Sequence, residues 1–228
     1  MKQLTNDNAA NRSSYVGGVY NVGERAVKSE ILASLPNEWS RLHLDGYIHI
    51  HDLDAYGKTY NCLTFNVLSR FPYELFRGLS DSAKIIRLFG YFKTMFADMG
   101  NEQSGGMAFA NFDNELEEIL RVLEVADSEI TRELIASCIG DFILWCNNTH
   151  TRMGQTSYYV TLNIGLARNE RARFIAGSVI DEFEKCGETV YKPNIVFKVS
   201  AGVNRTEGDR NFDLYQKALL CTAKKMIP

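Results

Sequence analysis

The sequence predicts an α/β fold with about five mainly parallel strands and interleaved helices. Two observations support this class: short segments with period-two alternation of apolar residues recur along the chain, and longer segments with apolar residues at helical spacing separate them. Strands that alternate with helices are typical of parallel sheets, because each parallel connection has to cross over the sheet. With 228 residues, of which 45% are hydrophobic, the chain can bury a substantial core.

The N-terminal residues 1–45 are predicted to form a helical segment, and residues 46–228 are predicted to form one incomplete domain. A first helix is expected near residues 23–35. Pro36 is well placed to open a second helix, which Asp45-Gly46 would end. The helical segment therefore precedes the first expected strand.

The remaining elements follow from the same two periodicities. Strands are expected over residues 47–50, 59–67, 107–112, 158–164 and 194–199. Helices are expected over residues 81–99, 114–125, 128–148, 169–185 and 212–226. In the second strand, Tyr60, Cys62 and Thr64 share one face. The 128–148 helix is expected to bury one stripe of side chains, formed by Leu134, Cys138, Phe142 and Trp145.

The charge pattern and the apolar runs exclude several classes of protein. The formal net charge is −3 and no run of Lys or Arg occurs, so we expect no binding to nucleic acid and no broad attraction to anionic lipid. No stretch approaches the roughly 20 apolar residues of a membrane helix. The N-terminus also lacks the charged-then-apolar pattern of a signal peptide. We therefore expect a cytoplasmic protein without a membrane segment.

The five cysteines are odd in number and widely spaced, without a CxxC pair. This spacing argues against a secreted disulfide scaffold and against a zinc knuckle. Cys138 and Cys146 lie on an apolar helical stripe and Cys221 lies on the last helix, so we expect all three to pack in the core. Two interpretations of Cys62 stay open: a packed small side chain, the commonest fate of a free cysteine, or a reactive thiol.

His49 and His51 lie two positions apart on an expected strand, and therefore on one face of it, with carboxylates following at a turn. A zinc or iron site needs a third or fourth ligand, and the remaining histidines, His43 and His150, stand in no recognised ligand spacing. We predict no metal site here and favour a hydrogen-bonded turn.

Two loops rich in small polar residues, 100–106 and 152–157, precede expected strands. Such loops can bring backbone amides to a phosphate or a base. Neither loop is a Walker loop and neither fits GxGxxG, so each is equally compatible with a plain turn.

Several short motifs occur in a fixed order along the chain. The first are His49-Ile50-His51-Asp52-Leu53-Asp54, Asn61-Cys62-Leu63, and Gly105-Gly106 leading to Asn111-Phe112-Asp113. The later ones are Arg152-Met153-Gly154-Gln155-Thr156-Ser157, Leu162-Asn163-Ile164-Gly165, Pro193-Asn194-Ile195-Val196-Phe197-Lys198 and Gly202-Val203-Asn204. Together, over about residues 6–228, they resemble the anaerobic (class III, glycyl-radical) ribonucleoside-triphosphate reductases.

The resemblance implies a ten-stranded α/β barrel of two five-stranded parallel halves with a finger loop threaded through the middle. This chain would form the first half. The implied activity converts ribonucleoside triphosphates to deoxyribonucleoside triphosphates. A cysteine thiyl radical abstracts the ribose 3′-hydrogen, the 2′-hydroxyl leaves as water, and the hydrogen is then restored.

The resemblance also implies roles for individual residues. Cys62 would be the catalytic thiol that supplies reducing equivalents on the substrate face. The implied substrate-binding residues are Asn61, Gln155, Thr156 and Ser157. The implied effector-binding residues are Gln103, Ser104, Gly105, Gly106 and Arg152.

Other parts implied by the resemblance have no counterpart in the chain. The thiyl cysteine belongs to the finger loop, which the resemblance places shortly after Pro228. The last helix ends at Met226-Ile227-Pro228 without a tail, so we also expect a truncated or split chain. The glycyl-radical segment and a structural four-cysteine zinc site would lie further on, and an ATP-binding cone is absent ahead of Asn6. We therefore expect a fragment that holds no cofactor itself and is inactive alone.

The implied partners are nucleoside triphosphates, with deoxynucleotides and ATP as effectors, a radical-SAM activating enzyme, and a second copy of the chain in a homodimer. A half-barrel would leave one sheet edge and an apolar inner face open. We therefore expect a second-half polypeptide carrying the finger loop and the glycyl radical, or a longer natural protein. The alternative is a non-catalytic deoxynucleotide-binding or interaction module derived from that enzyme. Another glycyl-radical enzyme fits the two N-terminal motifs less well.

Overall fold

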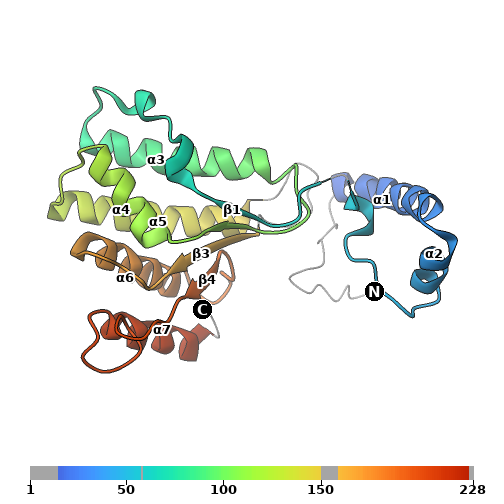
Figure 1. Cartoon of the computed structure of the whole chain (residues 1–228). Helices are drawn as coiled ribbons and strands as arrows, with labels where there is room; N and C mark the ends of the chain where they lie inside the picture. Colours follow the sequence, from blue (N-terminus) through green and yellow to red (C-terminus); the bar gives the residue numbers. More distant parts are fainter. Residues whose placement is uncertain (1–14, 58, 150–158, 226–228) are drawn as a thin grey trace.

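The computed structural model describes residues 15–57, 59–149 and 159–225. Within these residues four strands form one parallel sheet in the order β1-β2-β3-β4, so neighbours in the sheet are also successive in the sequence (Figure 1). The strands are β1 (Leu63–Phe65), β2 (Met107–Phe109), β3 (Val160–Ile164) and β4 (Asn194–Phe197). The predicted α/β class with interleaved helices is therefore confirmed.

Helices precede the sheet and connect its strands. The α-helices of the described residues are α1 (Tyr15–Ser34), α2 (Asn37–Leu44), α3 (Asp81–Met99), α4 (Phe112–Val122), α5 (Glu129–Asn148), α6 (Glu170–Lys185) and α7 (Phe212–Lys225). Short 3-10 helices are η1 (Leu53–Ala55), η2 (Val67–Arg70) and η3 (Tyr73–Phe76). Ser80, Ser128 and Asn169 each accept a backbone N–H in the first turn of α3, α5 and α6, which stabilises these helix starts. None of the described helices combines the length and hydropathy needed to span a bilayer.

Residues 47–50 form no strand, so this prediction is wrong. The backbone amides of Tyr47 and Ile48 donate to the carbonyl oxygen of Leu42 at 2.9 and 3.2 Å, and the Ile50 amide donates to Nδ1 of His43 at 3.1 Å. These local bonds wrap the segment around the end of α2 and occupy the donors that a sheet would need. The sheet accordingly has four strands, not five, in the described part of the chain.

The strand expected over residues 59–67 is shorter than predicted. In the structure β1 covers only Leu63–Phe65, and the 3-10 helix η2 begins at Val67. Its two faces are nevertheless the predicted ones. Thr64 is exposed, whereas Leu63 and Phe65 are half-buried against the core. Side chains therefore alternate across β1 as a parallel strand requires.

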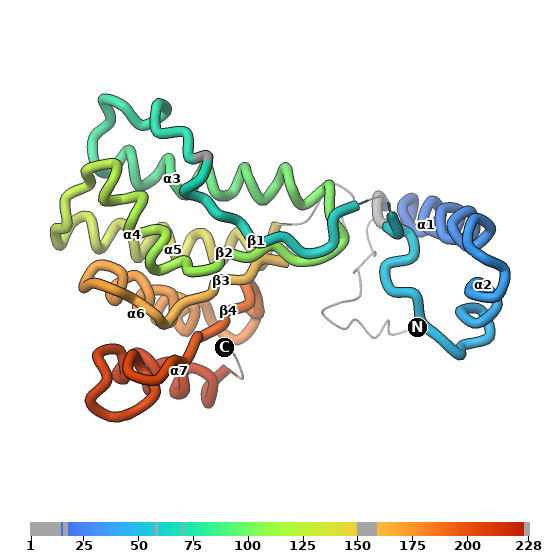
Figure 2. The backbone as a smooth tube through the Cα atoms, viewed as in Figure 1, coloured from blue at the N-terminus to red at the C-terminus, as the bar shows by residue number. Residues whose placement is uncertain are grey.

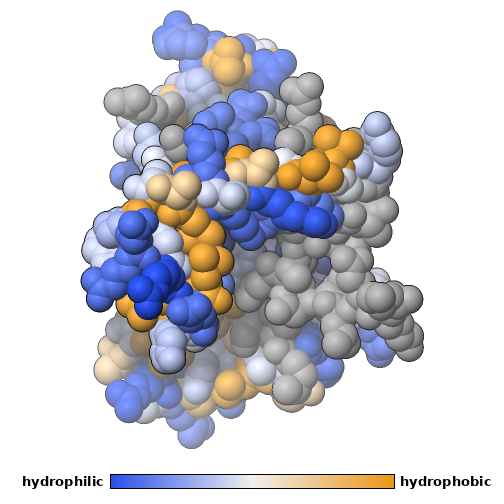
Figure 3. Space-filling model, turned by 90° about the vertical axis from the view of Figure 1, so that its right-hand side faces the viewer, coloured by the Kyte–Doolittle hydropathy of each residue, from blue (hydrophilic) through white to orange (hydrophobic). Residues whose placement is uncertain are grey.

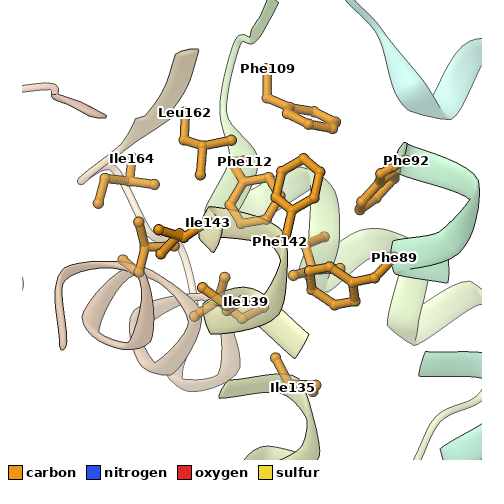
Figure 4. Packing of buried hydrophobic residues seen from close by; sticks show 14 of the residues in the cluster. Phe89, Phe92, Phe109, Phe112, Ile135, Ile139, Phe142, Ile143, Leu162 and Ile164 are labelled. Atoms are coloured by element: carbon orange, nitrogen blue, oxygen red, sulfur yellow. The ribbon is translucent and has the colours of Figure 1, made fainter. Parts of the chain in front are cut away.

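The core lies between one face of the sheet and α3, α5 and α6. Figure 4 shows Phe109 of β2 beside Phe92 of α3 and Phe112 of α4, and Phe142 of α5 packs against Phe92. The ring centroids of Phe92 and Phe109 are 5.1 Å apart, as are those of Phe109 and Phe112, and both pairs meet edge to face. This arrangement is the one that aromatic pairs prefer, and it makes the core aromatic rather than purely aliphatic.

The stripe that α5 buries lies beside the predicted one. Its fully buried members are Ile135, Ile139, Phe142, Ile143 and Cys146. Of the predicted set only Phe142 is among them, whereas Leu134, Cys138 and Trp145 are partly buried at the margins. Because α5 packs against both α3 and α6, a broad arc of its surface is apolar, and periodicity alone could not locate the centre of that arc.

Over β1 to β3, the other face of the sheet carries small and polar side chains. Thr64, Ala108 and Thr161 lie in one row across β1, β2 and β3, and Asn163 lies two residues further along β3. Thr64 is exposed and the other three are half-buried. The connections run in one direction across the sheet, so crossovers of the usual right hand bring their helices to the same side. The expectation of a largely apolar inner face is therefore wrong for β1 to β3, whereas Val196 of β4, opposite Asn163, is an apolar side chain that is 45% exposed.

Helices α1 and α2 pack with η1 at one end of the molecule, apart from α6 and α7 (Figure 1, Figure 2). Ile31 and Leu53 are the buried apolar side chains of this group, and the Tyr20 hydroxyl donates to Asp54 at 2.8 Å, which joins α1 to η1. Figure 3 views this end and shows hydrophobic side chains between hydrophilic ones. The exposed large side chains here include Val19, Val22, Trp39, Leu44 and Tyr47.

A buried carboxylate connects the carboxyl ends of β2 and β3. Asp113, which is 1% exposed, accepts hydrogen bonds from the backbone amides of Gly165 at 3.0 Å and Asn114 at 2.9 Å. Nearby, Nζ of Lys198 donates to Oδ1 of Asn111 at 3.0 Å. Burial raises the pKa of Asp113 to about 6, although the two amides and the charge of Lys198 act in the opposite direction.

This raised pKa predicts a pH-dependent difference between the wild type and the Asp113→Asn variant. Folded Asp113 takes up its proton at about pH 6, whereas the same carboxyl in the unfolded chain does so near its ordinary pKa of 3.8. The folded state is therefore favoured by protonation as the pH falls, and this contribution is lost as the pH rises through 6. Between pH 7.5 and 4.5 the free energy of unfolding of the wild type should gain about 2 kcal/mol relative to the variant.

Urea unfolding of both proteins at several pH values would measure this gain. A difference in unfolding free energy that stays constant over the range would contradict the assignment of the raised pKa to Asp113.

Candidate functional site

Cys62 and the loop formed by Glu102–Gly106 lie side by side at the amino ends of β1 and β2. The pairing of the two strands continues backwards into these segments with a shift of one residue, because Leu63 pairs with Met107 but Tyr60 bridges to Gln103. Its hydrogen bonds run from Tyr60 N to Glu102 O at 3.2 Å, Ser104 N to Tyr60 O at 2.9 Å, Gly105 N to Asn61 O at 3.0 Å and Leu63 N to Gly106 O at 2.9 Å. Two motifs that lie about 40 residues apart in the sequence are therefore hydrogen-bonded neighbours.

Gly105 lies directly against the residues that surround the Cys62 thiol. A Cβ atom at this position would lie 2.4 Å from Oδ1 of Asn61 and 2.7 Å from Sγ of Cys62. Real Cβ contacts are essentially never this short. Glycine is therefore required here for the close approach of two chains, not for a special backbone angle.

The side chain of Cys62 is exposed, and its thiol donates to Oδ1 of Asn61 at 3.5 Å. Of the two interpretations left open by the sequence, the structure favours an accessible thiol over a packed small side chain. Cys146 and Cys221 are buried, as predicted, and burial raises the pKa of both thiols. Cys138 packs against the core as predicted, but its side chain is only half-buried.

Gln103 points its side-chain amide back into the ladder. Its Nε2 donates to the carbonyl oxygens of Gly105 at 3.0 Å and Asn61 at 3.4 Å. Its Oε1 is buried and has no hydrogen-bond partner within the described residues. Ser104, by contrast, is exposed and contributes to the ladder through its backbone amide. The side chain of Gln103 is therefore turned into the loop, whereas Ser104 is exposed.

Tyr159 lies beside Gly106, because Tyr159, Gly106 and Cys62 each directly precede a member of the paired row Val160, Met107 and Leu63. A Cβ on Gly106 would lie 2.6 Å from Cδ1 of the Tyr159 ring, and the ammonium group of Lys192 lies 5.8 Å from the centre of that ring. Sequence reasoning missed Tyr159 as a site residue. The sequence places Tyr159 at the start of an expected strand, but it does not show which residue lies beside it in the sheet. The contact with Gly106 depends on the strand register, which only the tertiary structure sets.

The histidine motif forms a turn. His49 and His51 do not share a strand face, because no strand forms there; their ring centroids lie 6.0 Å apart at a right angle. Asp52 has a φ of 47°, and its carbonyl accepts the Ala55 amide at 2.8 Å, which are features of a tight turn. Nδ1 of His51 lies 2.9 Å from Oδ2 of Asp52. In the described ranges no group of three or more His, Cys, Asp or Glu residues is arranged to hold a metal ion.

Four predicted site residues lie outside the described residues: Arg152, Gln155, Thr156 and Ser157. His150 lies outside them as well. Asn61, Cys62 and Gln103 to Gly106, in contrast, are brought together in one place. The described part of the site thus consists of an exposed thiol, two side-chain amides and a backbone ladder.

The chain was compared with known proteins. A family model described as anaerobic ribonucleoside-triphosphate reductase matches residues 7–228. The anaerobic ribonucleoside-triphosphate reductase of Escherichia coli (strain K12) is 25% identical over 219 residues, covering 85% of this chain and 31% of that protein. The protein of the same name from Haemophilus influenzae is 27% identical over 220 residues, with 85% and 31% covered. The one from Enterobacteria phage T4 is 26% identical over 255 aligned positions, with 100% and 42% covered.

An exposed cysteine held in the ladder of a parallel α/β sheet is compatible with the oxidoreductase named in these matches, and the family match extends over nearly the whole chain. The chain belongs to the anaerobic ribonucleoside-triphosphate reductase family. It spans 31% to 42% of the length of these relatives.

The close approach at Gly105 predicts that Gly105→Ala destabilises the fold more than Gly106→Ala. The new methyl group at position 105 would collide with Asn61 and Cys62, and such overpacking costs about 1–3 kcal/mol. At position 106 it would meet the ring of Tyr159, which is 41% exposed and can turn away. Urea unfolding of the two variants and the wild type would measure the difference. Equal midpoints for the two variants would show that the Cys62 segment gives way easily at Gly105.

Proposed function

We propose that this chain is part of an anaerobic ribonucleotide reductase that converts ribonucleoside triphosphates to deoxyribonucleoside triphosphates by radical chemistry, and that Cys62 is its catalytic thiol. The observation that carries this proposal is the exposed Cys62 thiol, held by the β1–β2 ladder against Gly105. A thiol that has to reach a substrate must be accessible and held in place, and Cys62 has both properties.

The environment of Cys62 suits a nucleoside substrate. The thiol lies at the amino end of β1, and the residues that follow on the uncovered sheet face are small and polar, such as Thr64, Ala108 and Thr161. Small side chains leave room for a sugar, and hydroxyl groups can pair with its hydroxyls. Asn61 adds a side-chain amide beside the thiol and is the proposed substrate-binding partner of Cys62.

The proposed reaction divides the chemistry between this chain and segments outside it. A thiyl radical takes the 3′-hydrogen of the ribose, the 2′-hydroxyl leaves as water, and Cys62 donates a hydrogen atom to the sugar before the 3′-hydrogen returns. The two electrons consumed come in the end from an external reductant, formate or a small redox protein, which returns Cys62 to its thiol form. The finger-loop cysteine that forms the thiyl radical, the glycyl-radical segment and the four-cysteine zinc site are proposed to belong to the rest of the enzyme. The reaction would take place in the cytoplasm.

Deoxynucleotides and ATP are the proposed effectors, and Gln103 to Gly106 with Arg152 form the proposed effector-sensing residues. The turned-in amide of Gln103 supports a role inside the loop, whereas the exposed Ser104 is available to a ligand. A homodimer, a radical-SAM activating enzyme and a polypeptide carrying the second half of the barrel are the proposed partners. The uncovered polar sheet face is the surface that this second half would adjoin.

The proposal predicts that Cys62→Ser abolishes reduction of ribonucleoside triphosphates by the complete reductase. The hydroxyl of serine cannot supply reducing equivalents, so the rate should fall by a factor of about 10³ or more. Cys138→Ala, which changes a half-buried cysteine of α5 that packs against the core, should leave the rate within about threefold. The measurement is deoxynucleotide formation under strictly anaerobic conditions.

Full activity of Cys62→Ser would overturn the catalytic assignment. The second candidate is a non-catalytic deoxynucleotide-binding module, and nucleotide binding without any ribonucleotide reduction by the complete assembly would favour it. The coverage of only 31% to 42% of the relatives keeps that candidate open.

Nucleotide binding by the 228-residue chain tests the effector assignment separately. We expect saturable binding of dTTP or dATP, and Arg152→Ala should weaken it by about tenfold or more, since a charge-assisted hydrogen bond to phosphate contributes about 1.5–3 kcal/mol. Calorimetric titration of each nucleotide into each protein gives the dissociation constants. Unchanged affinity in the variant would remove Arg152 from the proposed effector site.

A further inference from the structure

The side chain of Gln103 hydrogen-bonds both its own loop and the segment that carries Cys62. We propose that Gln103 is a positioning residue: its side-chain amide locks this loop to the segment that carries Cys62, so that the loop and the thiol move as one unit. The structural part of this inference stands on the contacts alone. Its consequence for catalysis depends on the function proposed above for Cys62.

The first support is the double hydrogen bond of the Gln103 amide. Nε2 reaches the carbonyl oxygen of Gly105 within its own loop and the carbonyl oxygen of Asn61 across the ladder. The Asn61 carbonyl also accepts the backbone amide of Gly105 at 3.0 Å. The peptide bond directly before Cys62 is therefore bound by two donors, and both belong to the same short loop.

The second support is the contact on the other side of that peptide bond. Gly105 lies so close to Oδ1 of Asn61 and to Sγ of Cys62 that a Cβ there would overlap both. The same Oδ1 accepts the thiol of Cys62. A displacement of the loop must therefore shift Asn61 and, through it, the thiol.

The third support is the loss of stability that a glutamine side chain causes at this position. Oε1 of Gln103 is buried without a partner within the described residues, and an unpaired buried acceptor destabilises a fold. An apolar side chain of similar length would fill the space without that cost. The feature that glutamine adds is the Nε2 donor pair, and this pair is what the proposal assigns to the positioning of Cys62.

The test compares hydrogen exchange in the wild type with Gln103→Met, Gln103→Glu and Ser104→Ala. Methionine keeps the size and removes the donors, whereas glutamate keeps the shape and replaces the donor with an acceptor that faces two carbonyl oxygens. Ser104→Ala is the matched control in the same loop, because its backbone amide bond to Tyr60 is kept. Exchange is followed by mass spectrometry in peptides covering residues 60–66, 100–107 and 81–99.

We expect amide exchange in residues 60–66 and 100–107 to accelerate together by about three- to tenfold in Gln103→Met and more in Gln103→Glu. Ser104→Ala and the α3 peptide should be unchanged. Faster exchange in the 100–107 peptide without faster exchange in residues 60–66 would overturn the positioning role, and so would unchanged exchange in both. Equal acceleration of the α3 peptide would also overturn it, since Gln103 would then only stabilise the fold.

The complete reductase provides the catalytic readout. Because Gln103→Met displaces Asn61 together with Cys62, kcat should fall about tenfold, and by a larger factor than KM rises. A raised KM with unchanged kcat would contradict the positioning role. This result is separable from the catalytic assignment itself: if Cys62→Ser remains active, the proposed function fails, whereas the exchange experiment on Gln103 still decides the structural coupling.

Discussion

The backbone ladder that pairs residues 60–65 with residues 102–109 is the constraint on which the candidate site depends. It begins before either strand begins, because the amide of Tyr60 already donates to the carbonyl of Glu102. Gly105 permits the close approach of the two segments where their pairing shifts by one residue, between Tyr60–Gln103 and Leu63–Met107. The position of Cys62 is therefore set by the hydrogen bonds that build the sheet, and a rigid sheet holds a side chain more firmly than a free loop does.

The one-directional order of the sheet explains why this thiol is accessible while others are not. Helices α3, α5 and α6 pack on one face and bury Phe109, Phe142 and Cys146. The opposite face retains Thr64 and its polar neighbours. A cysteine on the helix side is desolvated, which disfavours its thiolate, whereas Cys62 on the uncovered side can meet a polar ligand. The topology of the fold thus buries the cysteines that pack in the core and leaves Cys62, the proposed catalytic thiol, accessible.

The aromatic core shows that the described part of the sheet forms a packed unit. Phe92, Phe109 and Phe142 are each at most 1% exposed, although the chain spans only 31% to 42% of the length of its relatives. The uncovered surfaces include the sheet face with Thr64 and Thr161, the apolar side chains of α1 and α2, and Leu219 and Leu220 of α7. The proposed second half of the reductase would adjoin the first of these surfaces, because the substrate has to be enclosed from that side.

Local signals in the sequence determined the order and type of most elements. Helix α3 spans Asp81–Met99 as predicted, since a serine cap and apolar residues at helical spacing are both encoded within the segment. The family resemblance selected Cys62 and the residues around Gly105 as site candidates, and the structure brings them into contact. For Arg152, in the part of the chain outside the described residues, the assignment stays a prediction.

Only the tertiary structure decided which alternating segments became strands and which faces became buried. Residues 47–50 alternate like a strand but use their amides on the end of α2, and the buried stripe of α5 is centred beside the predicted one because two helices pack against it. The inward turn of Gln103 and the placement of Tyr159 beside Gly106 likewise depend on strand register. The periodicity of a segment indicates which of its residues can share a face. Which strand or helix packs against that face is determined by partners that are distant in the sequence.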